Sequence, residues 1–373
     1  MTVPWMAPDL FPAKPAESEY GFAVGPRAVG CSQADLAARC GDRKQSPVWL
    51  VWIPESHRLV PPCEVPFLHQ ALLESALGRT RQGLAVALFS SAFFGLAYFV
   101  PLLMSRRAFP GMLLLFCILG AIPVIEGLLA LRHLRGDAAG VMARESAVVR
   151  YASWLYGRKL QVTWMLAGIL IGLQLLQFLV GGDASIRAAG LMKPAVREGE
   201  WWRLFTAPLL HGGLFHILFN GMALFSLGRS IEGLGDRSLA AAVFVVSALA
   251  GGVASVVFLP DAASVGASGG LMGYLGFLAV LGMRRKAELP REYVKSIVFS
   301  LVMIAAVGIA VWNRIDNAAH AGGLLAGMVF GALRIPREGP FPLASGPILR
   351  AVGALSVAVL AASAVGTGVA ILR

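Results

Sequence analysis

Polar side chains that can do chemistry stand at the edges of long apolar runs in this sequence. Ser268 lies within Gly266-Ala267-Ser268-Gly269-Gly270, where one apolar run begins. A serine at the start of a helix has unpaired backbone N–H groups and the positive end of the helix dipole beside it, which suit a nucleophile and an oxyanion. The alternative is a serine that only caps the helix or packs in a contact of small residues.

His320 stands near the start of another apolar run and is a candidate base for such a serine. Histidine can take the proton of a serine hydroxyl and return it to a leaving amine, provided that the two side chains are within hydrogen-bond reach. Gly323, Gly327 and Gly331 follow at intervals of four, so one face of the predicted helix allows a neighbouring helix to approach closely. A histidine that only packs at a helix end is the alternative.

His216 and Asn220 are four residues apart, so on a helix they share one face. Both can donate a hydrogen bond to an oxyanion beside Ser268, and the loss of one such donor typically costs about 10²–10³ in rate. His211 precedes His216 by five residues. A metal site at these two histidines is the alternative, but histidine ligands on one helix usually stand three or four apart, and no carboxylate or cysteine follows at ligand spacing.

These residues belong to a chain of 373 residues that is 57% hydrophobic and 14% charged, with a mean hydropathy of +0.70. An ordinary soluble domain is about 25% charged. Several apolar runs of about 20 residues exclude a soluble globular fold and predict a helical protein that crosses the membrane many times. The net charge of +11 lies mainly between the apolar runs, which indicates membrane topology and not nucleic-acid binding.

Nine apolar runs are candidate membrane spans. They cover residues 83–104, 111–131, 161–181, 214–228, 238–259, 268–283, 294–312, 319–333 and 349–372. Arg and Lys are concentrated in 132–159 and 284–295, which places both segments in the cytoplasm. Counting spans from these segments puts the N-terminus inside. The segments expected outside are 182–213, 260–267 and 313–318.

Taken together, these motifs resemble the rhomboid family of intramembrane serine proteases. The resemblance extends from about residue 160 to 335. It rests on the motifs above, in the family's order and spacing, together with Glu200-Trp201-Trp202-Arg203 and Glu232. The fold that it implies is an all-α polytopic membrane protein, with a six-helix rhomboid-like core and extra N-terminal and C-terminal spans.

The resemblance implies that Ser268 is the nucleophile and His320 its general base, a dyad without the acidic third member of a soluble triad. It makes His216 and Asn220, with the backbone N–H of Ser268, the oxyanion site. Active-site support is expected from His211, Gly266 and Gly269. Because water must reach an acyl-enzyme, we expect Ser268 at the floor of a polar cavity that opens to the outside and is lined by His211, His216 and Asn220.

Three residues of the pattern are expected to be structural. Trp202 and Arg203 fall in the first outside loop, which family members embed in the membrane. Glu232 is expected to tie down the cytoplasmic end of the second core helix. The sequence departs from the family at Met272, where relatives usually carry an aromatic ring beneath the histidine. Methionine can still contact an imidazole through its thioether, but it orients the ring less firmly.

The predicted domains are a small soluble cytoplasmic segment at 1–80, two extra spans at 83–135, the protease core at 160–335 and an extra span at 347–373. A strand-like run at 48–53 and a helical pattern at 67–77 fall in the first of them. Its thiols, Cys31, Cys40 and Cys63, form no CxxC pair, which favours free thiols in a reducing cytosol over the alternative of a zinc site.

The sequence thus predicts an intramembrane serine protease that hydrolyses peptide bonds in or near transmembrane segments of membrane-protein substrates. We expect it in the bacterial inner membrane, because no organelle signal is evident, with no cofactor, no metal and no nucleic-acid partner. One alternative is a proteolytically silent rhomboid-like protein that binds clients. Another is a transporter or channel, although broken spans in inverted halves are not evident. The substrate and the oligomeric state stay open.

Overall fold

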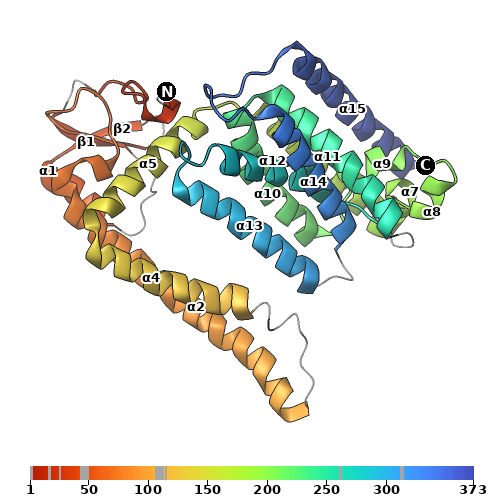
Figure 1. Ribbon diagram of the computed structural model, residues 1–373, viewed down its shortest axis with the longest axis horizontal. Helices are drawn as coiled ribbons and strands as arrows, with labels where there is room; N and C mark the ends of the chain where they lie inside the picture. Colours follow the sequence, from red (N-terminus) through yellow and green to blue (C-terminus); the bar gives the residue numbers. More distant parts are fainter. Residues whose placement is uncertain are drawn as a thin grey trace. The chain divides into compact units, whose positions relative to one another are not determined.

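The computed structural model describes residues 3–15, 18–24, 27–42, 50–105, 113, 116–259, 263–310 and 315–373. The chain divides into two compact units. The amino-terminal unit comprises Thr2–Trp154 with Val302–Val311, and the larger unit comprises Leu155–Leu301 with Trp312–Arg373. Helices dominate both units (Figure 1), as the predicted all-α class requires.

A three-stranded antiparallel sheet, in the order β2-β1-β3, lies in the amino-terminal unit. Its strands are β1 (Tyr20–Val24), β2 (Arg27–Cys31) and β3 (Leu50–Trp52). Phe22 stands opposite both Val29 and Val51 in the register. The sequence predicted β3 within the run 48–53, whose first two residues lie outside the described part of the chain. It did not predict β1 and β2, because their short segments are interrupted by glycine.

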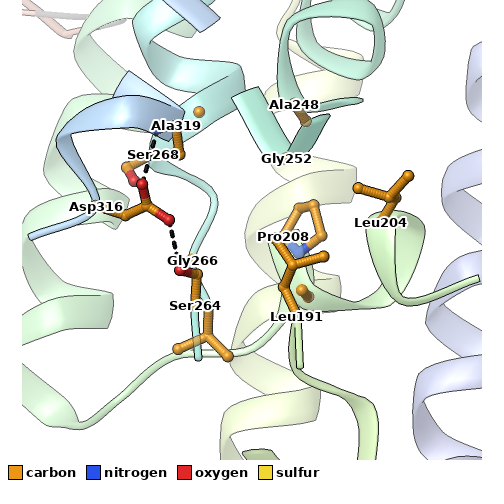
Figure 2. Close-up of a pocket in the computed structure, with 13 residues that line it drawn as sticks. Leu191, Leu204, Pro208, Ala248, Gly252, Ser264, Gly266, Ser268, Asp316 and Ala319 are labelled. Atoms are coloured by element: carbon orange, nitrogen blue, oxygen red, sulfur yellow. Dashed lines mark hydrogen bonds between the residues drawn. The ribbon is translucent and has the colours of Figure 1, made fainter. Parts of the chain in front are cut away.

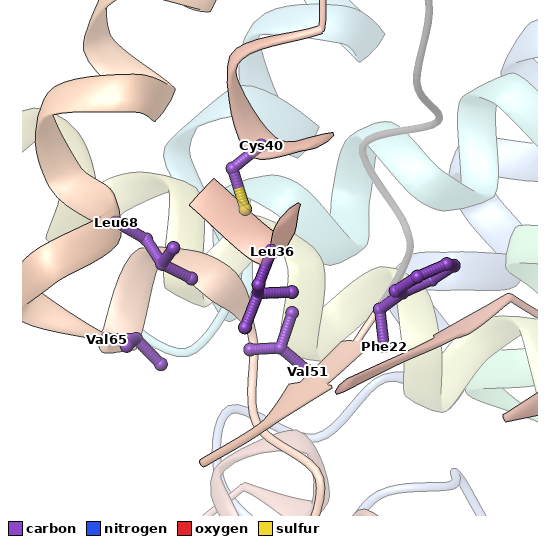
Figure 3. Close-up of a cluster of buried hydrophobic side chains, with 6 residues drawn as sticks. All are labelled: Phe22, Leu36, Cys40, Val51, Val65 and Leu68. Carbon is purple, nitrogen blue, oxygen red and sulfur yellow. The ribbon is translucent and has the colours of Figure 1, made fainter. Parts of the chain in front are cut away.

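Helix α1 (Gln33–Gly41) packs against β1 and closes a small apolar core (Figure 3). Ser32 caps this helix, since its hydroxyl oxygen accepts the N–H of Asp35 at 3.1 Å. The core cluster consists of Phe22, Leu36, Cys40, Val51, Val65 and Leu68. The sheet and α1 thus share a core with the turns that precede α2.

The cysteines of this unit are free thiols. Burial raises the pKa of Cys40 to about 12 and that of Cys63 to about 12, so both stay protonated at neutral pH. In the part of the chain that the structure describes, no group of three or more His, Cys, Asp and Glu side chains is placed to hold a metal ion.

Long helices complete the amino-terminal unit. They are α2 (His69–Ser105), the π-helical segment η4 (Phe116–Ala121), α4 (Ile122–Gly136) and α5 (Ala138–Tyr156). Helices α2 and α4 lie side by side as a hairpin (Figure 1). The hairpin is closely packed at Gly120, where a Cβ would lie 2.6 Å from the Cα of Ser91. Residues 106–112, 114 and 115 of the predicted span 111–131 and its preceding loop lie outside the described residues.

Among the described residues, six main helices and the first part of a seventh, α13, build the larger unit. They are α6 (Gln161–Val180), α10 (Leu214–Leu234), α11 (Arg237–Phe258), α12 (Ser268–Arg284), α13 (Arg291–Ala310), α14 (Asn317–Arg334) and α15 (Pro347–Leu372). Between α6 and α10 the chain forms α7 (Gly182–Ala189), α8 (Lys193–Arg197), α9 (Arg203–Thr206) and the turn η5 (Ala207–Leu209). Helix α13 is divided between the two units after Leu301.

Helix α12 is the central helix of the larger unit, and it contacts α10, α11 and α14. Its contact with α14 is a seam of glycines. A Cβ on Gly323 would lie 2.1 Å from the carbonyl oxygen of Gly269, and one on Gly327 would lie 2.0 Å from that of Gly273. The two backbones therefore touch, as the glycines every four residues predicted.

Seven helices among the described residues are long and apolar enough to cross a membrane. They are Pro66–Met104, Cys117–Gly136, Gln161–Val180, Leu214–Leu234, Arg237–Phe258, Arg291–Ile309 and Pro347–Leu372. The remaining two predicted spans, 268–283 and 319–333, form α12 and α14. These helices have only 17 and 18 residues and are rich in glycine, so they stand apart from the other seven.

Candidate active site

Ser268 is the first residue of α12, and the chain enters this helix through a glycine. Gly266 has a φ of +126°, a backbone conformation that side chains with a Cβ rarely adopt. Its N–H donates to the carbonyl oxygen of Ala207 at 3.0 Å, which fixes the turn against the loop between α6 and α10. The hydroxyl of Ser268 is thereby presented at a helix N-terminus, next to N–H groups without an intrahelical partner.

His216, in the first turn of α10, faces this turn. A Cβ built on Gly266 would lie 2.8 Å from Nε2 of His216 and 3.9 Å from Oγ of Ser268, so imidazole and hydroxyl share one side of the glycine. The other ring nitrogen, Nδ1, accepts the N–H of Gly212 at 3.3 Å. Because Nδ1 accepts this bond, the proton of the neutral ring is on Nε2, the nitrogen that lies next to Gly266.

Asn220 lies one turn further along α10 and is buried. Its side-chain Nδ2 donates to the carbonyl oxygen of His216 at 2.9 Å, which occupies one of its two amide hydrogens. The structure thus brings Asn220 to the helix face that carries His216, as predicted from their spacing.

His320 is in the first turn of α14, where its backbone N–H donates to the carbonyl oxygen of Asp316 at 3.1 Å. The glycine seam holds this turn against the start of α12, since Gly323 meets Gly269 there. Ala319, the preceding residue, lines a pocket together with Ser268. No hydrogen bond among the described residues joins Oγ of Ser268 to the ring of His320. The two side chains therefore stand on touching helices but are not joined in this structure.

The pocket beside Ser268 has a volume of about 40 Å³, enough for about three water molecules (Figure 2). Its walls include the residues Leu191, Leu204, Pro208, Ala248, Gly252, Ser264, Asp316 and Ala319. The sequence predicts a cavity at Ser268 that is lined by His211, His216 and Asn220, and none of these three residues lines this particular pocket. The pocket is bounded by the loop between α6 and α10, by α11 and by the loop before α14.

Asp316 is the polar residue of this pocket that the sequence reasoning missed. Its carboxylate accepts hydrogen bonds from Ser255, Ser264 and the N–H of Ala319, and Nζ of Lys193 is 3.6 Å away. Burial alone would raise the pKa of Asp316, but these donors and the lysine charge outweigh it and hold the pKa below its ordinary value. An aspartate at a helix start is a recognisable N-cap signal, and that signal alone could have singled it out.

His211 lies behind His216, with ring centroids 5.1 Å apart in an edge-on arrangement, and it is buried. Gln177 of α6 clamps its backbone, accepting the N–H of His211 at 3.0 Å and donating to its carbonyl oxygen at 3.1 Å. Burial, with a smaller contribution from the neighbouring His216, lowers the pKa of His211 to about 3, so its ring stays neutral. This placement makes His211 a packing support for His216.

Comparison with known proteins addresses the family directly. Residues 198–337 match the Rhomboid domain. The chain is 34% identical over 182 residues to "Rhomboid protease GluP" of Bacillus subtilis (strain 168), which covers 46% of this chain and 36% of that protein. It is 31% identical over 144 residues to "Putative rhomboid protease YdcA" of the same organism, which covers 38% of this chain and 72% of that protein. This chain belongs to the rhomboid family.

Plant rhomboids are similar over the same part of the chain. The identity to "RHOMBOID-like protein 5" of Arabidopsis thaliana is 30% over 153 residues, which is 40% of this chain and 50% of that protein. The chain thus spans about a third of the length of GluP and half of the length of this plant relative. With its seven apolar helices, this rhomboid is an integral membrane protein.

In this rhomboid, Arg203 ties together the loop between α6 and α10. Its Nη1 donates to the carbonyl oxygens of Arg187, Ala188 and Gly190 at 3.1, 3.2 and 2.9 Å. Because these oxygens end α7, the guanidinium closes the carboxyl end of that helix. The same group contacts the ring of Trp202 at 4.6 Å from its centroid, and Trp202 is 42% exposed.

Glu232 holds the opposite end of the rhomboid core. Its Oε1 accepts the N–H groups of Gln161 and Val162, each at 2.9 Å, and its Oε2 accepts the N–H and the hydroxyl of Thr163 at 2.9 and 2.6 Å. The carboxylate is buried. It therefore caps the amino end of α6 from the carboxyl end of α10. The contact joins the first core helix to the second, a partner that the sequence did not identify.

Proposed function

We propose that this rhomboid is an intramembrane serine protease, which hydrolyses peptide bonds in or near transmembrane segments of other membrane proteins. The observation that carries the proposal is that a serine at the N-terminus of α12 and Nε2 of His216 lie on the same side of Gly266. A nucleophile with a hydrogen-bond donor nearby is the arrangement that acyl transfer needs.

In the proposed reaction, Oγ of Ser268 attacks the carbonyl carbon of the scissile bond while His320 takes the hydroxyl proton. The oxyanion that forms accepts hydrogen bonds from the N–H of Ser268, from Nε2 of His216 and from the amide of Asn220. His320 then gives its proton to the leaving amine as the C–N bond breaks. A water molecule attacks the acyl ester, His320 takes its proton, and Ser268 regains its own as the carboxylate product leaves.

This reaction requires Ser268 and His320 to meet. Catalytic hydrogen bonds are often long or absent without substrate and form in the Michaelis complex, so a side-chain rotation across the α12–α14 seam is the expected first step. The oxyanion role of Asn220 likewise needs its second amide hydrogen, since the first is bound to the carbonyl oxygen of His216.

The proposed setting follows from charge. Arg and Lys in 132–159 and 284–295 favour the cytoplasm, which places the N-terminus inside and Ser268 near the outer face of a bacterial inner membrane. In this arrangement, the segment 1–80 is a cytoplasmic domain that precedes two extra spans and the protease core at 160–335. A substrate helix must unwind before it is cut, so glycine or proline near the cut should favour cleavage.

A fluorophosphonate probe on purified protein in detergent tests the proposal. We expect wild type to be labelled and both Ser268→Ala and His320→Ala to lose at least about 99% of the labelling, because removing either member of a nucleophile–base pair costs several orders of magnitude. Equal labelling of wild type and Ser268→Ala would contradict the assignment of the nucleophile. If wild type stays unlabelled while another rhomboid protease is labelled alongside, the silent client-binding function replaces this proposal.

A further inference from the structure

One carboxylate joins four separate segments of the larger unit next to the site. Asp316 caps α14 by accepting the N–H of Ala319 at 2.8 Å, and it accepts the hydroxyls of Ser255 of α11 and Ser264 of the loop before α12. Lys193, at the start of α8, completes the cluster with Nζ at 3.6 Å and a side chain that is entirely buried. Figure 2 shows Asp316 between Ser264 and Ala319.

Two of these contacts lie directly beside the proposed dyad. Ser264 is four residues before Ser268, and its backbone also pairs with Leu191 through N–H···O bonds of 2.9 and 3.2 Å. On the other side, the carbonyl oxygen of Asp316 accepts the N–H of His320 at 3.1 Å. A single residue therefore holds the loop that leads to the nucleophile and the turn that carries the base.

The chemistry of the cluster requires an ionised carboxylate. A carboxylate only accepts hydrogen bonds and can take about four, which matches two hydroxyls and one N–H plus the charge of Lys193. An asparagine amide in the same place would replace one of the two acceptor oxygens by an NH₂ donor. That donor would face the hydroxyl donors and the ammonium group of Lys193. Neither Ser255 nor Ser264 has an alternative acceptor of this strength among the described residues.

We propose that Asp316 is the positioning residue of this rhomboid: it sets the distance between Ser268 and His320 by clamping Ser264 to the start of α14. The inference rests on the proposed function. Asp316 touches neither substrate nor the reacting atoms in this role. Its removal should slow the reaction of Ser268 in folded protein, because the loop from Ser264 to Ser268 loses its anchor to α14.

The test measures the second-order rate constant of fluorophosphonate labelling for folded, purified full-length protein, together with its thermal unfolding midpoint. Asp316→Asn should label at least tenfold more slowly than wild type. Asp236→Asn is the matched control, because Asp236 caps α11 through the N–H of Leu239 at 2.9 Å without any bond to the Ser268 loop. It should label within twofold of wild type. With a single-span substrate, Asp316→Asn should lower kcat and leave KM unchanged.

If Asp316→Asn does not fold, Ser264→Ala tests the positioning role of Asp316. This variant removes one hydroxyl and leaves the cap of α14 and the ion pair with Lys193 in place. It should label at least threefold more slowly than wild type with an unchanged unfolding midpoint, and Ser264→Thr should restore the rate. Wild-type labelling by Ser264→Ala overturns the positioning role while the protease proposal stands. Labelling that persists in Ser268→Ala overturns the protease proposal instead.

Discussion

Two carboxylates hold the larger unit together: Glu232, which is buried, and Asp316, which is partly buried. All four bonds to Glu232 come from the first turn of α6, so this residue joins one helix to one helix. The hydrogen bonds and the ion pair of Asp316 come from α8, α11, α14 and the loop before α12. Glu232 is also remote from the site, about 24 Å along α10 from His216 at 1.5 Å per residue.

The two carboxylates therefore stabilise different things: one fixes a single helix of the fold, and the other fixes the relative positions of segments around the proposed site. A carboxylate that caps one helix fixes where that helix begins, and small movements there do not reach Ser268. A carboxylate shared by four segments fixes their mutual positions, and two of those segments lead to Ser268 and His320. We therefore expect Glu232 to matter for stability and Asp316 to matter for the reactivity of the folded protein.

The largest change in stability should come from Glu232→Ala. It leaves three N–H groups and the hydroxyl of Thr163 without their charged acceptor. Because water replaces part of this bonding, the expected loss of unfolding free energy is about 4 kcal/mol, the value of two charge-assisted hydrogen bonds. Thermal unfolding in detergent measures this loss. The fluorophosphonate labelling rate of the fraction that remains folded should equal that of wild type, and a fall in that rate would remove the contrast with Asp316.

Gly327→Ala should cause the second largest loss of stability, and it should also slow fluorophosphonate labelling. Its new Cβ would lie 2.0 Å from the carbonyl oxygen of Gly273, so α12 and α14 must move apart, at a cost of about 3 kcal/mol. Because these helices carry Ser268 and His320, labelling should fall together with the unfolding midpoint. Gly368→Ala on α15 is the control, since no atom lies within 4 Å of the new methyl group. If Gly327→Ala lowers the unfolding midpoint and the labelling rate as little as Gly368→Ala does, α12 and α14 are not in close backbone contact at Gly327.

Asp236→Ala should cost about 1 kcal/mol, the ordinary value of an N-cap. Its side chain caps only α11, through the N–H of Leu239. The unfolding midpoint should therefore fall far less than in Glu232→Ala. A loss of stability as large as that of Glu232→Ala would show that the four bonds of Glu232 contribute no more to stability than a single helix cap does.

The smallest effect should be the pH dependence of stability due to Asp316. Its folded pKa is below the ordinary value of 3.8, so the ionised carboxylate contributes stability above pH 3.8, and this contribution is lost as the pH falls through the folded pKa. The effect is small because burial opposes the hydrogen bonds. Midpoints measured between neutral pH and acid should decline more steeply for wild type than for Asp316→Asn. Parallel curves would argue against a lowered pKa.

Much of this architecture could be predicted from the sequence, because membrane helices and glycine spacings are local patterns. The apolar runs predicted the helices, and Gly323, Gly327 and Gly331 predicted a close helix contact that the structure shows with α12. The spacing of His216 and Asn220 correctly placed them on one helix face. Each of these inferences needs only residues within a few turns of one another.

What escaped prediction depends on contacts between distant segments. Ser255 and Ser264 precede Asp316 by 61 and 52 residues, and nothing in their local sequence indicates a shared carboxylate. The pocket beside Ser268 is lined by Leu191 and Asp316, which are distant from it in the sequence, and spacing alone does not indicate such neighbours. Strands β1 and β2 were missed for a related reason, since their pairing with β3 is settled by the tertiary core.

The glycine seam has one more consequence, for how far the two helices can slide. Gly323 meets Gly269, Gly327 meets Gly273, and Gly331 meets Phe277. The difference in residue number between the contacting residues is the same at each of these contacts, so α12 and α14 run parallel in a fixed register. Because these contacts recur every four residues, a shift of one helix by less than about 6 Å would drive backbone into backbone. The axial register between Ser268 and His320 is thus set in discrete steps, and a substrate of the proposed protease would have to enter through movement of elements other than these two helices.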